Sequence, residues 1–324
     1  WSWSEPGVHP RRAKLIGDTL LVPSRGGLIG LDVERGEERW RWRGEVMRRG
    51  LLHPHGEDRA LLQLSGVEML ELNARTGEVL ARHDLPRMHR ITQARPLAGG
   101  VLLFGERGSA AALDLERGEL RWHHAGGAQG PASYACAPGV LLRLQGRRMM
   151  RLDPDTGEVL WQVDAGSHGR AVCLHLGRAV VIGGGAQRAQ TNVRSFLIED
   201  GSLRHELSLD GYYLSPVRSL GEDLWLVIER GRRPVIEVLR GEELYPAWIR
   251  PLREQHRALT PSLTPLERDG AQQVLVQTAA SQLVMLDARE GRPIWDVDAA
   301  PLMRAPQPAA PIRDAVLCLG EALE

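Results

Sequence analysis

"LDVERGEERW", Leu31 to Trp40, is the stretch of this sequence that decides the fold. It continues the alternating apolar run "GLIGLD", passes through a polar segment to Gly36, and closes on a tryptophan four residues after that glycine. Alternating apolar and polar residues predict a half-buried strand. A glycine adopts the positive φ that a tight hairpin turn requires. The stretch therefore predicts a strand, a tight turn and a second strand.

The same ten-residue frame recurs along the chain. Strong copies are "LNARTGEVLA" (Leu72 to Ala81), "LDLERGELRW" (Leu113 to Trp122), "LDPDTGEVLW" (Leu152 to Trp161) and "LDAREGRPIW" (Leu286 to Trp295). Weaker copies are "FLIEDGSLRH" (Phe196 to His205) and "IEVLRGEELY" (Ile236 to Tyr245). The repeat glycines are Gly36, Gly77, Gly118, Gly157, Gly201, Gly241 and Gly291, and the repeat tryptophans are Trp40, Trp122, Trp161 and Trp295. A repeat of about forty residues is typical of stacked structural units.

Each repeat holds four predicted strands. A further apolar run, such as "TLLVPS" or "AVVIGG", precedes each copy, and one more short segment precedes that run, as at Ala171 to Gly177. Four short strands in about forty residues predict one blade of a β-propeller. A single four-stranded sheet cannot cover both of its faces, so we expect each repeated tryptophan to dock on the adjacent blade. Ala81, His205 and Tyr245 take its place in the other units.

The two ends of the chain predict how the ring closes. Trp1 lies one repeat before Trp40, so "WSWS" aligns with "RWRW" at Arg39 to Trp42. After Trp295 the chain provides two further short strands, the second at Ala315 to Leu319. We therefore predict an all-β propeller of four-stranded blades forming a single domain over residues 1–324, cut from a longer chain. Eight blades are expected, with the N- and C-terminal strands sharing one composite blade; seven blades with frayed ends are the alternative.

Composition narrows the range of functions. Basic and acidic residues balance at 41 each, which argues against a nucleic-acid binder. No apolar run is long enough to span a membrane. Three cysteines form no Cys-x-x-Cys pair. The histidines of "HPH" (His53 to His55) and "HH" (His123 and His124) lack a third ligand in the sequence, so no metal site and no cofactor are predicted.

The motif L-D-x-x-x-G-E-x-x-W resembles the tryptophan-docking motif of the PQQ-like propeller repeat, and the resemblance runs from Trp1 to Leu319. Its known members include quinoprotein alcohol dehydrogenases, BamB-type lipoproteins of the outer-membrane assembly machinery, and sensor domains of bacterial kinases. The quinoprotein enzymes hold their cofactor against a disulfide of adjacent cysteines, and this chain has no adjacent cysteine pair. The resemblance therefore implies the BamB-like, non-enzymatic branch and a protein-binding scaffold, with the bacterial envelope favoured over the cytoplasm. The alternative is a sensor domain that binds an anion, and a quinoprotein dehydrogenase is disfavoured.

Two groups of residues are candidate sites. The stretch between the sixth and seventh repeat glycines is the longest, so we expect it to form a protruding protein-contact loop. Its candidate contact residues are Tyr245, Trp248, Ile249, Arg250, Leu252 and Arg253. Basic residues also recur in the segments that enter the first strands, which a propeller gathers at one mouth of its channel. The candidate anion-binding residues are Arg12, Arg49, Arg90, Arg170, Arg218, Arg257 and Arg304. The plainer interpretations are an outer strand that packs on its own blade, and arginines paired with nearby glutamates.

Overall fold

The computed structural model describes most of the chain. The described residues are 13–24, 26–45, 50–86, 88, 90–126, 132–166, 168–184, 189–252, 262–268, 271–277, 282–298, 310–312 and 315–317. Within them the chain forms strands and turns without a helix, and so no helix that could cross a membrane. The predicted strand of the composite blade at Trp1 to Ser4 lies outside the described residues.

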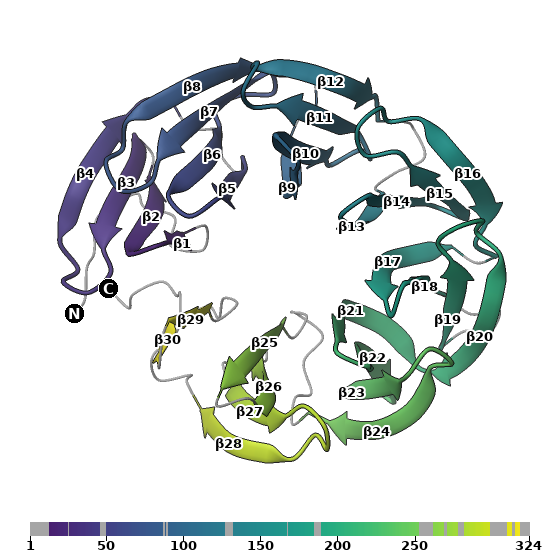
Figure 1. The fold of residues 1–324 in the computed structure, drawn as a ribbon. Coiled ribbons are helices and arrows are strands. Elements are labelled where there is room, and N and C mark those ends of the chain that lie inside the picture. Colours follow the sequence, from purple (N-terminus) through teal and green to yellow (C-terminus); the bar gives the residue numbers. More distant parts are fainter. Residues whose placement is uncertain are drawn as a thin grey trace. The chain divides into compact units, whose positions relative to one another are not determined.

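Seven four-stranded antiparallel sheets and one strand pair make up the described part of the chain (Figure 1). The first three sheets are β1 (Lys14–Ile16), β2 (Thr19–Ser24), β3 (Gly27–Asp32), β4 (Glu38–Arg43); β5 (Leu52–His55), β6 (Arg59–Gln63), β7 (Glu68–Asn73), β8 (Val79–Asp84); and β9 (Ile91–Leu97), β10 (Gly100–Gly105), β11 (Ala110–Asp114), β12 (Glu119–His124). The next two are β13 (Ser133–Ala137), β14 (Val140–Gln145), β15 (Arg148–Leu152), β16 (Val159–Asp164); and β17 (Gly169–His175), β18 (Arg178–Gly184), β19 (Gln190–Leu197), β20 (Leu203–Asp210). The last are β21 (Tyr212–Leu220), β22 (Asp223–Arg230), β23 (Arg233–Arg240), β24 (Tyr245–Pro251); β25 (Ser262–Arg268), β26 (Ala271–Gln277), β27 (Gln282–Asp287), β28 (Pro293–Asp298); and the pair β29 (Ala310–Ile312) and β30 (Ala315–Leu317).

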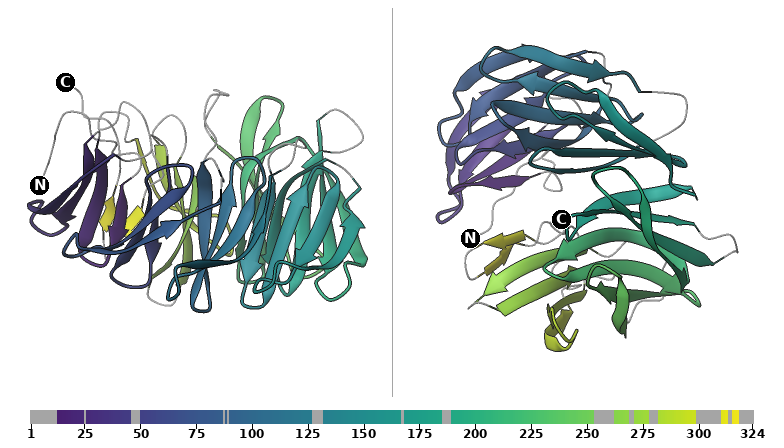
Figure 2. Two further views of the ribbon diagram at one scale, coloured as in Figure 1. Left: turned by 90° about the horizontal axis from the view of Figure 1, so that it is seen from above. Right: turned by 45° about the vertical axis from the view of Figure 1, so that its right-hand side comes forward.

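The chain divides into two compact units. The first comprises residues 1–132 with 152–160, and the second comprises residues 133–151 with 161–324. In both units, consecutive strands lie side by side in the sheets, as the two further views in Figure 2 show. The first and fourth strands of each four-stranded sheet are its edges. The single domain over residues 1–324 stays a prediction.

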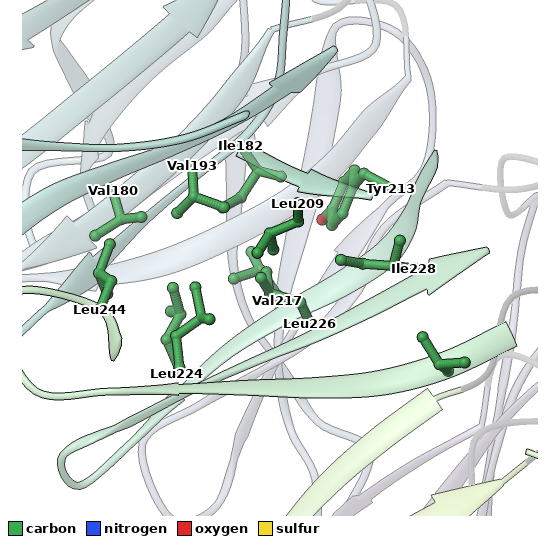
Figure 3. Packing of buried hydrophobic residues seen from close by; sticks show 12 residues of the cluster. Val180, Ile182, Val193, Leu209, Tyr213, Val217, Leu224, Leu226, Ile228 and Leu244 are labelled. Atoms are coloured by element: carbon green, nitrogen blue, oxygen red, sulfur yellow. The ribbon is translucent and has the colours of Figure 1, made fainter. Parts of the chain in front are cut away.

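Apolar side chains from neighbouring sheets form the core. In the second unit, Val180 and Ile182 of β18 pack in one buried cluster with Leu224 and Leu226 of β22 (Figure 3). In the first unit, Leu28 of β3 belongs to a cluster with residues of β6 and β7, and a second cluster joins the sheets β5–β8 and β9–β12. Each of these sheets therefore buries a face against the next one, as expected for units that cannot cover themselves.

The turn between the third and fourth strands explains the aspartate and the glycine of the motif. The Oδ1 atom of Asp32 accepts hydrogen bonds from the backbone N–H groups of Glu34 and Arg35 at 2.9 and 2.8 Å. The N–H of Gly36 donates to the Asp32 carbonyl at 2.8 Å, and Gly36 has φ of 75°. Asn73, Asp114 and Asp153 cap their turns in the same way. Such side chains satisfy the backbone of a tight turn.

The repeated tryptophans join one sheet to the next turn. The indole N–H of Trp40 donates to the Ala74 carbonyl at 2.9 Å, that of Trp122 to Pro154 at 2.9 Å, and that of Trp161 to Ile198 at 2.7 Å. Each ring also covers the turn glycine three residues beyond its acceptor: a Cβ at Gly77 would lie 2.5 Å from the Trp40 ring, and one at Gly157 would lie 2.7 Å from Trp122. The glycine thus provides both a positive φ and the space that the ring occupies.

The sixth sheet departs from the alignment predicted from the sequence. In β3 and β4, Gly30 pairs with Trp40 just before a register shift, and in β23 and β24 the equivalent pair is Val238 with Trp248. Trp248, rather than Tyr245, is therefore the docking residue, and its ring would lie 2.7 Å from a Cβ at Gly291. The turn position of Gly36 is taken by Leu244, which has φ of 57°.

This corrects the alignment of the sixth copy by three residues. Gly241 has φ of 73°, but a Cβ there would meet nothing within 4 Å, so no indole covers it. Leucine in the left-handed region is strained. Leu244 is held there because its side chain is buried in the cluster between the fifth and sixth sheets.

Candidate functional site

The predicted protein-contact loop begins as an outer strand. Residues 245–251 form β24, the edge of the sixth sheet, and residues 262–268 form β25 of the seventh sheet. Arg253 and residues 254–261 lie outside the described residues. The contact residues of the described part are therefore displayed on a strand, as the plainer interpretation of this segment expected.

Alternation along β24 separates its side chains into two sets. Trp248 and Arg250 point inward, and the Arg250 guanidinium donates to the Gly291 carbonyl at 3.1 Å. Leu252, directly after the strand, is 6% exposed. Trp248 also stands edge-to-face on Trp225 at a centroid distance of 4.9 Å. Tyr245 and Ile249 point away and are 63% and 46% exposed. Of the predicted contact residues that the structure describes, these two remain accessible to a partner.

Exposed apolar side chains also occur on β28, the outer strand of the next sheet. Ile294 and Val297 are 52% and 50% exposed, and their strand follows the turn at Gly291 on which Trp248 is docked. Other outer strands expose aliphatic side chains as well, namely Val79, Leu80, Leu120, Val159, Leu160 and Leu203. Tyr245 sets β24 apart because tyrosine combines a large apolar ring with a polar tip, which suits a protein contact.

The predicted anion-binding arginines fall into three situations. Arg12, Arg49, Arg257 and Arg304 lie outside the described residues. Arg90 is paired with Glu106 at 2.9 Å, so its charge is already compensated. Arg170 donates to the Tyr213 carbonyl at 3.5 Å, and Arg218 donates to the Val217 carbonyl at 3.1 Å. A ring built from all seven arginines stays a prediction.

A second basic group in the first unit was not predicted from the sequence. Lys14 of β1, His53 of β5 and Arg95 of β9 stand on the first strands of three successive sheets. Burial lowers the pKa of His53 to about 4, and the charges of Arg95, Lys14 and His55 act in the same direction. These three residues are spaced by about one repeat in the sequence. That spacing points to a common site only when the first strands that carry them are known.

Histidines and cysteines provide no further site in the described part of the chain. No group of three or more His, Cys, Asp or Glu side chains is placed there to hold a metal ion. Burial lowers the pKa of His55 and of His123. Cys173 is a free thiol, and burial raises its pKa to about 12. A thiol that stays protonated at neutral pH is a poor nucleophile.

Comparisons with known proteins agree with this architecture. The family model described as "Outer membrane protein assembly factor BamB" matches residues 2–135, 67–213 and 145–304. BamB from Moraxella catarrhalis is similar in structure, with a TM-score of 0.65 and 15% identity over 98% of this chain and 96% of that chain. The computationally designed Ika8 protein has a TM-score of 0.73 and 13% identity over 96% and 92% of the two chains. At such identities the likeness concerns the fold alone, and it confirms the predicted all-β propeller. No curated protein matched the sequence.

Proposed function

The chain belongs to the family of the outer membrane protein assembly factor BamB, and from this membership we propose that it is a non-catalytic scaffold that binds a protein partner. The bacterial cell envelope is proposed as its compartment on the same ground. The proposal includes no catalytic step, because the sequence lacks the adjacent cysteines against which the quinoprotein enzymes hold their cofactor.

The observation that carries the proposal is the exposed apolar side of β24. Tyr245 and Ile249 are held on a strand whose opposite side is fixed by Trp248, and Leu252 is buried directly after the strand, so the exposed pair needs no rearrangement to meet a partner. Rigid presentation lowers the conformational entropy that binding must overcome. Exposed aromatic and aliphatic side chains on a rigid surface are typical of contact residues at protein interfaces.

The edge position of β24 favours an extended partner segment. Within the described residues, β24 pairs on one side with β23, and its other side is the edge of the sheet. An exposed edge offers backbone N–H and C=O groups to an added strand, while alternate side chains give specificity. Tyr245 and Ile249 would then contact the apolar residues of that segment.

Affinity purification of the protein from its own cells tests the proposal. The test variant is Y245S/I249S, and the matched control is V159S/L160S, whose two side chains are each 51% exposed on the outer strand β16. Point substitutions are preferable to deletion, because removing residues 246–265 would eliminate β24 and part of β25.

One envelope protein retained by the wild type and by V159S/L160S, and lost from Y245S/I249S, would support the proposal. Equal loss of the partner protein from both variants would show that β24 is not the specific contact. If no protein is retained by the wild type, the scaffold itself is contradicted.

A further inference from the structure

Three successive first strands of the first unit bring basic side chains to the same edge of their sheets. β1, β5 and β9 are each the first strand of a four-stranded sheet, and β5 lies beside both β1 and β9. Lys14, His53 and Arg95 are carried by these three strands. Lys14 is the single lysine of the chain, and the spacing from one residue to the next is about one repeat.

The positive charge of this group is not neutralised by carboxylates in the described part of the chain. Lys14 and Arg95 are exposed, and the Arg95 guanidinium donates to the Ala94 carbonyl at 3.1 Å. Four arginines of the same unit differ, because each of them meets an acidic side chain at hydrogen-bonding distance: Arg39, Arg59, Arg90 and Arg121. A basic group without acidic partners attracts anions.

The pKa of His53 reflects the local positive potential. Its ring is half-buried, and burial is the first cause that lowers its pKa to about 4. Arg95, Lys14 and His55 each lower the pKa of His53 further, and among the described residues no acidic side chain acts in the opposite direction. At neutral pH the His53 imidazole is therefore uncharged and carries one N–H donor, close to two permanent cations.

We propose that Lys14, His53 and Arg95 form a binding site for a phosphate group of a small ligand on the first-strand edge of the first unit. The site uses none of the arginines predicted from the sequence, and it does not depend on the scaffold proposal. The two positive charges of Lys14 and Arg95 equal the charge of a phosphate dianion, whereas a single carboxylate would neutralise only one of them. The planar guanidinium donates two parallel N–H bonds to phosphate oxygens, the ammonium provides a point charge, and the imidazole N–H serves a third oxygen.

The experiment follows the His53 ring by NMR during a titration of the full chain with inorganic phosphate at constant ionic strength, with chloride and acetate as reference anions. The H53Q variant assigns the resonance. Bound phosphate stabilises the imidazolium, so the pKa of His53 should rise in phosphate while that of the exposed His123 changes little. R95Q should weaken phosphate binding roughly tenfold or more, as expected for the loss of a charge-assisted hydrogen bond. R218Q, which alters an exposed first-strand arginine of the second unit, should leave the affinity within about twofold.

K14Q provides a second variant should R95Q alter the fold, and it should weaken binding in the same direction. Equal shifts of His53 and His123 in phosphate and in chloride would show general screening and overturn the proposal. Equal affinity of the wild type and both variants would also overturn it. A response to acetate as strong as that to phosphate would contradict the assignment of a phosphate group.

Discussion

Replacing Trp248 by alanine tests the register of the sixth sheet. The glycine-based alignment assigns the docking role to Tyr245, whereas the strand register assigns it to Trp248, opposite Val238. If the register is correct, W248A lowers the free energy of unfolding by about 3 kcal/mol, while Y245A changes it by about 0.5 kcal/mol or less. The two residues lie on the same strand, so each substitution is the control for the other.

The magnitude follows from the surroundings of the ring. Trp248 covers Gly291, contacts Trp225 edge-to-face at 4.9 Å, and packs against the cluster between the sixth and seventh sheets. Removing about 100 Å² of buried apolar surface costs about 2.5 kcal/mol, and the aromatic pair adds about 1 kcal/mol. The indole nitrogen has no hydrogen-bond partner in the described part of the chain. Removing this unsatisfied N–H group therefore offsets a fraction of the free energy that is lost with the ring. Tyr245 is 63% exposed and loses little contact.

Urea denaturation followed by far-UV circular dichroism measures the difference, because this signal depends less on the lost tryptophan than fluorescence does. The midpoint for W248A should fall well below that of the wild type, with the midpoint for Y245A close to it. Equal midpoints for the two variants, or a lower midpoint for Y245A, would refute the register argument. The result also bears on the partner experiment, since a small effect of Y245A means that Y245S/I249S can lose binding without losing the fold.

Individual contacts give three further predictions. G291A should lower the free energy of unfolding by about 3 kcal/mol, because its Cβ would displace the Trp248 ring. G241A should lower it by about 1 kcal/mol, because only the positive φ of Gly241 opposes an alanine there. Urea midpoints measure both differences. E71Q should cost about 1.5 kcal/mol at pH 7, since Glu71 is 3% exposed and loses the charge-assisted hydrogen bond that it accepts from Arg59, whose own side chain is 53% exposed and stays solvated; the same denaturation measures it. Cys173 should react with iodoacetamide at pH 8 at least about a hundredfold more slowly in the folded chain than in urea, and C173S identifies its share of the labelling.

The sequence predicted the fold well because the repeated residues act locally. An aspartate or asparagine that caps a turn and a glycine with positive φ impose the same hairpin wherever they occur, so the frame at Leu31 recurs in the structure at Leu72, Leu113 and Leu152. The sixth copy was misaligned because its glycine is not the residue of the turn. Leu244 adopts the positive φ of the turn because its side chain is buried between two sheets. Such burial depends on contacts between residues that are distant in sequence.

The candidate sites were harder to predict for the same reason. Whether an arginine meets a carboxylate depends on neighbours on other strands: Arg90 meets Glu106, whereas Arg95, five residues later, meets no acidic side chain in the described residues. The segment after Leu244 was expected to be a loop because of its length, but alternation between Trp248, Ile249 and Arg250 makes its first part a strand. Spacing between repeats thus located the segment without specifying which side chains it exposes.

The seam between the second and third sheets shows what replaces a tryptophan. Ala81 stands opposite Glu71, where other sheets place an indole, and Ala81 is too small to reach the next turn. His83, two residues later, approaches Gly118 in its place, and its Nε2 lies 3.5 Å from the Glu71 carboxylate. The polar contact with His83, followed by the hydrogen bond from Arg59, lowers the pKa of Glu71, although burial opposes this shift. A carboxyl group whose pKa is lowered by folding stabilises the fold above its ordinary pKa of 4.5, and that stability is lost as the pH falls from this value through the lowered pKa. Acid should therefore weaken this seam before it weakens the seams that Trp40 and Trp161 hold with an uncharged ring.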